Sequence, residues 1–344
     1  MAVAPIAYCG DPGFTKQAPL DQPQTHARVT DNCTLRDYFA SAASGRRLTD
    51  DDFIHEVLIT RLNLRMATLN PDADLVSCAI HDCNAPFCPE DAIVQARKLA
   101  RRLGRQLACL DVGANLGSCG LWWLSEQLCH TVVFYEPNPL VARLLNWTLT
   151  HNALRGRGIL RVAAASDVAS TRQLALARGN SGHSMLGELA GGWSQLERHV
   201  EVPAVRLDEE PDVAALGAVD VIKLDVEGLE CEALRGLGFN STHRRGGLPA
   251  EQVAVLVVEA DDTLLRAAGC SEQQLRAFFP PERFHVYGAA GVSSDLLIFN
   301  DRAMSRLSRA HVKHVGEVRD PLQHQAWRYH GQDASGAGHH SNRR

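Results

Sequence analysis

The sequence has no apolar run of the roughly 18 or more residues that a membrane-spanning helix requires. Its first residues, MAVAPIAYCG, also lack the basic segment and the cleavage site that are typical of a secretory signal peptide. These two absences predict a soluble, cytoplasmic protein that does not insert into a membrane.

A marked excess of charge of either sign is also missing. The chain has 35 Lys and Arg residues against 40 Asp and Glu residues, which gives a formal net charge of −5. Proteins that bind nucleic acid usually carry a basic patch or stripe, so no nucleic-acid partner is expected. Hydrophobic residues make up 45% of the 344 residues, which excludes disorder throughout and predicts one large α/β domain with an N-terminal extension.

The ten cysteines show none of the paired two-residue spacings of known zinc modules. Cys109, Cys119 and Cys129 lie inside apolar runs, where a thiol usually behaves as a small buried hydrophobic group. We interpret these three in that way, as weak support for a reducing compartment.

A second group of cysteines lies nearer the N-terminus. Cys78, Cys83 and Cys88, with His81 between them, form the one cluster in the sequence that has metal-ligand chemistry. The intervals between them favour an ordinary cysteine-bearing loop, with a disulfide bond or a zinc site as alternatives.

Composition and periodicity divide the chain into four parts. The first is rich in Pro, Gly, Gln and Asp without periodicity and is predicted to be an extended or poorly ordered arm. The second is predicted to be helical, because apolar residues recur at helical intervals over 34–43 and 50–67. A main domain and a largely disordered tail follow. The four parts are residues 1–33, 34–104, 105–313 and 314–344.

From Leu107 onward, apolar strand patterns alternate with helical patterns, which is typical of a mostly parallel sheet covered on both faces. One of the helices, near residues 139–152, is expected to begin with Asn138 as its cap and Pro139 at its first position. The predicted strands are residues 107–112, 131–136, 159–165, 219–226, 254–260, 284–288 and 295–300.

Only residues 289–294 separate the last two predicted strands. A parallel crossover needs a dozen or more residues, so these strands must pair as an antiparallel hairpin. The sequence therefore predicts a Rossmann-like, seven-stranded, mostly parallel sheet with a C-terminal antiparallel hairpin strand. An all-parallel dinucleotide-binding fold does not predict that hairpin.

The segment LDVGANLGSCG places a glycine-rich turn between an apolar strand and an apolar helix. Gly113 and Gly117 allow the backbone to turn sharply and to approach a ligand closely. A dinucleotide fingerprint would need further glycines where Asn115 and Ser118 stand, so a nicotinamide-dependent oxidoreductase is a disfavoured alternative.

S-adenosylmethionine fits this turn better, because it carries an ammonium group, a sulfonium and a ribose but no phosphate. Asp111 or Asp225, each at the carboxyl end of a predicted strand, is a candidate partner for the ammonium. Glu136 stands nineteen residues after Gly117, at the end of the second strand, where a carboxylate can bind the ribose hydroxyls.

These motifs continue along the chain as EPNP, RVAAASD and VIKLDVEGLECEALRG. In that order they resemble the FkbM family of S-adenosylmethionine-dependent methyltransferases, over about residues 107–300. The resemblance implies a methyltransferase with S-adenosylmethionine as its cofactor, and usually O-methylation of a hydroxyl on a small molecule or glycan. The cofactor-binding residues that it and the motifs predict are Asp111, Gly113, Asn115, Gly117, Glu136, Asn138, Ala165, Ser166 and Asp225.

A hydroxyl acceptor is a poor nucleophile while it is protonated, so a base within hydrogen-bond reach is expected. Asp225 and Glu227 stand at the carboxyl end of one predicted strand and Glu259 at that of another, and these three are the candidate catalytic residues. Carboxylates that converge in this way can also bind Mg²⁺, but this alternative is not favoured and no metal ligand is assigned. Lys223 is expected to have a structural role.

His183 lies in the segment GNSGHSML, which we interpret as a flexible loop able to close over the site, although a solvated side chain is the favoured role for this histidine. One further alternative is a methyltransferase-like fold that serves as a non-catalytic binding or scaffold module. Neither the identity of the acceptor nor an oligomeric state is predicted.

Overall fold

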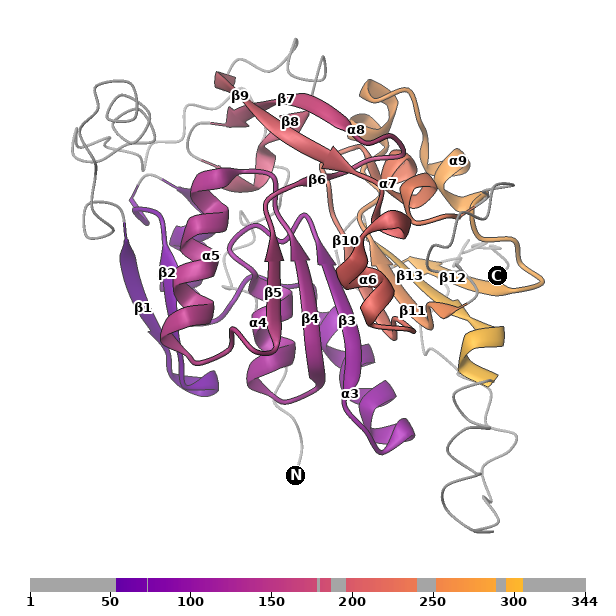
Figure 1. Cartoon of the computed structure of the whole chain (residues 1–344), viewed down its shortest axis with the longest axis horizontal. Helices are drawn as coiled ribbons and strands as arrows, with labels where there is room; N and C mark the ends of the chain where they lie inside the picture. The colour runs from indigo at the N-terminus through magenta and orange to yellow at the C-terminus, as the bar shows by residue number, and fades with distance from the viewer. Residues whose placement is uncertain are drawn as a thin grey trace, which may run out of the picture.

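The structure is a computed structural model that describes residues 54–72, 74–177, 180–186, 196–239, 252–288 and 295–305. Its centre is a seven-stranded sheet in the order β12-β13-β11-β10-β3-β4-β5 (Figure 1). Neighbours from β11 to β5 pair in parallel, whereas β13 is antiparallel to both β11 and β12. The strands are β3 (Leu107–Val112), β4 (Cys129–Tyr135), β5 (Gly158–Arg161), β10 (Val221–Leu224), β11 (Val255–Val258), β12 (Phe284–Gly288) and β13 (Leu296–Asn300).

Each of the seven predicted strands overlaps a strand of the structure, and the mixed α/β class with a mostly parallel sheet is confirmed. The segment predicted as one strand over 159–165 contains two, because β5 ends at Arg161 and β6 (Ala164–Ala165) belongs to another sheet. The connection at 289–294 lies outside the described residues.

Helices cover both faces of the sheet because side chains alternate along each strand. In β3, Cys109 belongs to one core cluster, while Leu110 and Val112 belong to the other. The first cluster lies under α3 (Glu90–Leu103), α4 (Ser118–Ser125) and α5 (Pro139–His151). The second lies under α6 (Pro211–Ala215), α7 (Glu230–Gly236), α8 (Asp262–Ala267) and α9 (Glu272–Arg276).

The chain order leaves a switch point between β3 and β10. From β3 the chain continues to β4 and β5 on one side, and later returns to β10 and β11 on the other. In open α/β sheets, ligands bind beside the carboxyl ends of the strands at such a point. The glycine turn after β3 and the acidic segment after β10 flank it.

A second, four-stranded sheet in the order β6-β9-β7-β8 lies beyond the arrowheads of β3, β4 and β5 (Figure 1). Strand β7 (Ser170–Ala177) pairs with β9 (Leu196–Val205) and with β8 (Met185–Leu186), antiparallel in both cases. Sequence analysis missed this sheet. The 3-10 turns η3 (Ser181–His183) and η5 (Leu207–Glu209) precede β8 and α6.

The expectation of a helix over 50–67 is wrong. Residues in this range form β1 (His55–Ile59), the 3-10 turn η2 (Thr60–Leu62) and most of β2 (Leu64–Thr68), and the two strands pair antiparallel. Asn63, in the left-handed conformation at φ 48°, reverses the chain between them. Helices do follow within the predicted N-terminal region, as α2 (Leu75–Cys83) and α3, whereas residues 34–43 lie outside the described part of the chain.

Strand β2 is attached to α5 of the main sheet by hydrogen bonds to side chains. The backbone N–H of Ala67 donates to Thr148 Oγ1 at 2.9 Å, and that of Arg65 donates to Asn152 Oδ1 at 2.9 Å. Thr148 is fully buried, so the N-terminal hairpin extends the core rather than lying apart from it.

Disulfide bonds correct the interpretation of the cysteines. Cys109–Cys129 links β3 to β4, Cys88–Cys119 links the segment before α3 to α4, and Cys231–Cys270 links α7 to the segment after α8. The predicted burial of Cys109, Cys119 and Cys129 is right, but they are not isolated thiols. The three disulfide bonds join cysteines that are 20 to 39 residues apart in sequence, and the apolar context of a cysteine does not reveal such a distant partner.

The N-terminal cysteine cluster is divided between two states. Cys83 and Cys88 are both disulfide-bonded, so neither is available to a zinc ion, and Cys78 is a free thiol. The disulfide alternative is therefore the one that the structure supports, over the ordinary loop that was favoured.

No helix among the described residues is both long enough and apolar enough to cross a membrane.

Candidate functional site

The glycine turn between β3 and α4 contains three residues in the left-handed region. Gly113, Asn115 and Gly117 have φ angles of 70°, 51° and 80°. A Cβ added to Gly113 would lie 1.7 Å from the backbone oxygen of Asp225, and one added to Gly117 would lie 2.3 Å from a methyl of Leu145. Both positions therefore require glycine. At Gly113 the reason is that the turn after β3 lies directly against the residue that follows β10.

Glu136 holds this turn from the end of β4. Its carboxylate accepts the backbone N–H of Asn115 at 2.7 Å through Oε2 and that of Asn138 at 2.7 Å through Oε1. Burial raises the pKa of Glu136 to about 7, against the lowering effect of these two donors and of Lys223. A proton at this carboxyl is therefore removed near neutral pH, where its oxygens become acceptors only.

Asn138 begins α5 as predicted. Its side-chain oxygen accepts the N–H of Leu140 at 3.1 Å, and Pro139 occupies the first helical position. Since its own N–H is bound by Glu136, this cap fixes the carboxylate relative to α5.

Asp111 lies beneath the turn rather than at its surface. It is fully buried, and its Oδ2 accepts the N–H of Gly120 in α4 at 2.8 Å. Burial raises the pKa of Asp111 to about 6, opposed by the charge of Lys223. Its other oxygen accepts no hydrogen bond from the described residues and lies 3.9 Å from Lys223 Nζ.

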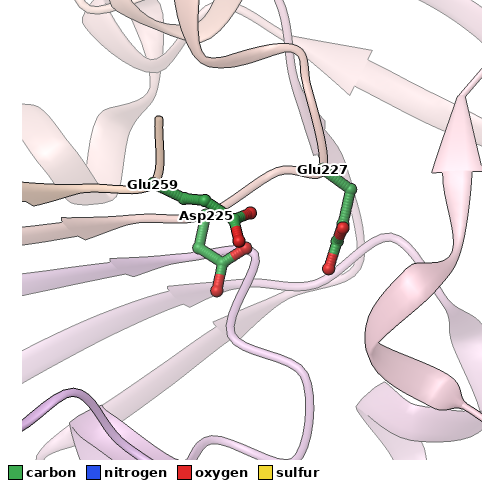
Figure 2. A group of neighbouring side chains, drawn as sticks. All are labelled: Asp225, Glu227 and Glu259. Atoms are coloured by element: carbon green, nitrogen blue, oxygen red, sulfur yellow. The ribbon is translucent and has the colours of Figure 1, made fainter. Parts of the chain in front are cut away.

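Three acidic side chains gather where β10 and β11 end, and we call Asp225, Glu227 and Glu259 the carboxylate cluster. One oxygen from each lies within 4.8 Å of the others. Figure 2 shows the three side chains converging from the ends of the two strands and from the turn after Asp225. Sequence analysis selected these three residues as catalytic candidates, and the structure brings them together.

Asp225 is the member of the carboxylate cluster that is most accessible to solvent. The side chain of Asp225 is 21% exposed, against 1% for that of Asp111. Glu227 and Glu259 are buried, at 7% and 4%. Of the two aspartates, Asp225 is the one that a molecule in solution can reach.

Lys223 connects the two sides of the switch point. Its ammonium donates to the backbone oxygen of Gly113 at 2.7 Å and lies 3.4 Å from Asp225 Oδ2. It projects from β10 opposite Asp111, with which it shares a register position. These contacts describe the structural role expected for Lys223. Its ammonium holds the glycine turn and compensates the negative charge of the neighbouring carboxylates.

The turn after Asp225 is shaped by Glu230, at the start of α7. Its carboxylate accepts the N–H of Val226 at 3.0 Å and that of Gly228 at 3.2 Å. Burial raises the pKa of Glu230 to about 7. Glu227 lies between these two donors with φ 55°, so the turn presents Glu227 in a conformation that a non-glycine residue rarely adopts.

Two predicted cofactor residues lie elsewhere. Ala165 packs in the core under α7, and Ser166 is buried with its hydroxyl donating to Glu232 Oε1 at 2.6 Å. Neither residue belongs to the carboxylate cluster, and a Cβ on Gly236 would lie 2.0 Å from the backbone oxygen of Ser166. Their predicted contact with a cofactor stays a prediction.

Sequence reasoning missed two residues beside the turn. Ser181, in η3, has its hydroxyl 3.5 Å from the side-chain amide of Asn115, and Asp74 accepts the backbone N–H of Ser181 at 2.7 Å. The segment that was interpreted as a flexible loop is thus held between α2 and the glycine turn, with His183 half-buried at its end. An N-cap signal at Asp74 before the apolar start of α2 was the one sequence hint.

Comparison with known proteins identifies one family. Residues 111–278 match the model of the methyltransferase FkbM domain, which spans both the glycine turn and the carboxylate cluster. No curated protein matches the chain.

Solved structures share a weak likeness. The methyltransferase FkbM from Methylobacillus flagellatus KT is 16% identical with a TM-score of 0.35, over 56% of this chain and 43% of that one. The bifunctional kinase-methyltransferase WbdD is 13% identical with a TM-score of 0.35, over 62% of this chain and 38% of that one. M. capricolum TrmK, solved with S-adenosyl-homocysteine, is 8% identical with a TM-score of 0.30, over 60% and 67%.

The chain thus spans less than half the length of the first two of these proteins. With TM-scores below 0.5, none of the three bears on what this chain binds or methylates.

Proposed function

We propose that this chain, whose residues 111–278 match the model of the methyltransferase FkbM domain, transfers the methyl group of S-adenosylmethionine to a hydroxyl of a small molecule or glycan. The observation that carries the proposal is the carboxylate cluster, whose three oxygens lie within 4.8 Å of one another beside the glycine turn at the switch point of the sheet.

The chemistry of the side chains at this edge suits the cofactor. S-adenosylmethionine offers an ammonium group and two ribose hydroxyls, all of which can donate hydrogen bonds to carboxylates. Asp225, the more exposed of the two aspartates, is assigned to the ammonium in place of the buried Asp111. Glu136 is assigned to the ribose, since each of its oxygens accepts one N–H and has a second lone pair available.

When bound, the cofactor supplies an electrophilic methyl group with a good leaving group already attached. The residues of the chain then have two tasks, to hold the acceptor in line with that methyl and to accept its hydroxyl proton. Glu227 and Glu259 are assigned to the second task, because both lie in the cluster beside Asp225. Glu227 has the left-handed conformation in the turn after Asp225, and its side chain extends from that turn beside those of Asp225 and Glu259 (Figure 2).

The remaining predicted cofactor residues shape the turn and hold the groups around it. Gly113, Asn115 and Gly117 keep the turn open to the cofactor, Asn138 holds Glu136, and Asp111 anchors α4 beneath the turn. Ala165 and Ser166 are assigned to cofactor binding on the family resemblance alone. Mg²⁺ at the carboxylate cluster is the alternative to a carboxylate base, and it is not favoured.

The disulfide bonds bear on where the protein works. Such bonds form and persist in oxidising compartments and are rare in the cytosol. Three of them among the described residues favour an oxidising compartment over the cytoplasmic location that the sequence predicts. Intact mass of the protein isolated from its source, with and without thiol alkylation, tests this placement.

Two measurements test the function itself. Calorimetry with S-adenosylhomocysteine tests the cofactor, and absence of heat would exclude it, whereas NAD(H) is expected to give none. A screen of polyol, sugar and phenol libraries with radiolabelled donor tests the acceptor, in buffer with EDTA and in buffer with MgCl₂. Transfer that persists with EDTA supports the carboxylate base, transfer restored only by MgCl₂ supports the metal alternative, and cofactor binding without transfer to any acceptor supports a non-catalytic module.

A further inference from the structure

Asp74 lies outside the FkbM match, at the cap of α2, yet its side chain reaches the glycine turn through one intermediate residue. Its Oδ2 accepts the N–H of Ser77 at 2.8 Å and the hydroxyl of Ser77 at 2.6 Å. These bonds are what a helix cap requires, and they occupy one oxygen.

The other oxygen of Asp74 is directed away from its helix. Oδ1 accepts the backbone N–H of Ser181 at 2.7 Å, across 107 residues of sequence, and the hydroxyl of Ser181 lies 3.3 Å from Oδ2. Asp74 and Ser181 are buried, at 5% and 6%. A buried carboxylate that binds this N–H fixes the start of η3 against the first turn of α2, because leaving either group without a partner is costly.

Ser181 in turn contacts the glycine turn. Its hydroxyl oxygen lies 3.5 Å from both the oxygen and the nitrogen of the Asn115 side-chain amide. The neighbouring Gly182 lies near both sides as well, since a Cβ there would make ordinary contacts at 3.4 Å with Val76 in α2 and at 3.8 Å with the Asn115 amide nitrogen. Segment 180–183 therefore lies between α2 and Asn115.

Asn115 completes the connection. It is in the left-handed conformation, and its N–H donates to Glu136, the carboxylate assigned to the ribose. Polar contacts thus run from Asp74 through Ser181 and Asn115 to Glu136, joining four segments that are far apart in sequence.

We propose that Asp74 is a positioning residue for the methyl donor, which holds Ser181 against Asn115 so that the glycine turn and Glu136 keep the arrangement that binds the cofactor. This inference rests on the proposed function. It means that the N-terminal segment, which the family match leaves out, completes the donor side of the site.

The variant Asp74→Ser separates the two tasks of the side chain. Serine is a good helix cap, so α2 retains its start, but its hydroxyl is one atom shorter than a carboxylate and does not reach Ser181. The control is Ser77→Ala, which removes a hydroxyl from the same cap and leaves the bond between Asp74 and Ser181 in place. Thermal melts compare the stability of both variants with that of the native chain.

Calorimetry with S-adenosylhomocysteine and steady-state kinetics with S-adenosylmethionine provide the readouts. We expect Asp74→Ser to weaken the affinity and to raise KM for the donor about tenfold, with kcat changed less than twofold, because one charge-assisted hydrogen bond is lost. Ser77→Ala is expected to stay within twofold of the native affinity at equal or lower stability.

Two results would overturn the inference: native affinity in Asp74→Ser, or an equal loss of affinity in Ser77→Ala. If Asp74→Ser does not fold, Ser181→Ala is the deciding variant, because it keeps the backbone bond to Asp74 and removes the hydroxyl beside Asn115. We expect Ser181→Ala to weaken the affinity for S-adenosylhomocysteine about threefold. Native affinity in this variant would refute the role of Asp74. A native chain that binds no S-adenosylhomocysteine contradicts the proposed function itself, which distinguishes the two failures.

Discussion

Carboxylates on the two sides of the switch point have the same chemistry but different surroundings. After β3 and β4, Asp111 and Glu136 are held by backbone N–H groups of the turn and of two helices. After β10 and β11, the carboxylate cluster brings three acidic side chains within 4.8 Å, next to Lys223. Backbone donors fix a carboxylate in place, whereas an acidic cluster favours uptake of a cation or a proton. The comparison assigns the ribose of the donor to the first side, and the ammonium of the donor together with the acceptor chemistry to the second.

The largest effect is expected from Asp225→Asn. Removing the exposed charge of the cluster should lower methyl transfer about a thousandfold, or about 4 kcal/mol of transition-state stabilisation, because the donor's ammonium loses its ionic partner. Radiolabel incorporation under saturating acceptor measures it. Glu56→Gln, which removes an exposed ion pair with Arg65, is the control and should leave transfer unchanged. Undiminished transfer in Asp225→Asn would remove this residue from the site.

Removing one disulfide bond on each side of the switch point tests how much each bond contributes to stability. The double variant Cys231→Ser with Cys270→Ser opens a bridge with a sequence separation of 39 next to the cluster, and should lower the free energy of unfolding by about 3 kcal/mol. The matched double variant Cys109→Ser with Cys129→Ser, on the donor side, opens a separation of 20 and should cost slightly less. Urea denaturation measures both, and identical midpoints with and without reductant would contradict the bridges.

Replacing Glu136 sharpens the assignment of the donor side. Glutamine has one acceptor oxygen in place of two, so either Asn115 or Asn138 loses the partner of its N–H. We expect Glu136→Gln to weaken S-adenosylhomocysteine affinity about thirtyfold, equal to about 2 kcal/mol, while KM for the acceptor changes little. A larger effect on the acceptor than on the donor in steady-state kinetics would reverse the assignment.

The smallest effect is a pH dependence of stability. Burial raises the pKa of Glu136 from its ordinary 4.5 to about 7, so the folded chain holds this proton over a range in which the unfolded chain has released it. Stability from this group is therefore greatest below pH 4.5 and falls as the pH rises toward 7. Between pH 6 and 7 the native chain should lose about 1 kcal/mol more than Glu136→Gln. Denaturation at the two pH values measures it, and parallel changes would contradict the raised pKa.

Local patterns were sufficient where one element decides the outcome. Apolar runs located β3 and β12 with the residue bounds that the structure has, and Asn138 with Pro139 marked the start of α5. Spacing also selected the carboxylate cluster, because residues at the ends of neighbouring parallel strands meet at one edge of the sheet.

Patterns failed where partners are distant. Leu58 and Leu62 are separated by a helical interval of four residues, yet they lie in a hairpin that is stabilised by its contact with α5. The second sheet was missed because β7 and β9 stabilise each other across a segment rich in Gly and Ser. Tertiary pairing overrides local propensity in such short segments.

The amino-acid sequence by itself determined the class of the fold, the position of the glycine turn and the acidic residues that surround it, because these follow from side-chain periodicity and from residue types at strand ends. Only the tertiary structure decided which carboxylates are held by backbone and which are gathered, which cysteines are joined, and that Asp74 reaches the turn from outside the family domain. Burial and distance set these outcomes, and both depend on contacts between residues that are distant in sequence, such as Asp74 and Ser181, 107 positions apart.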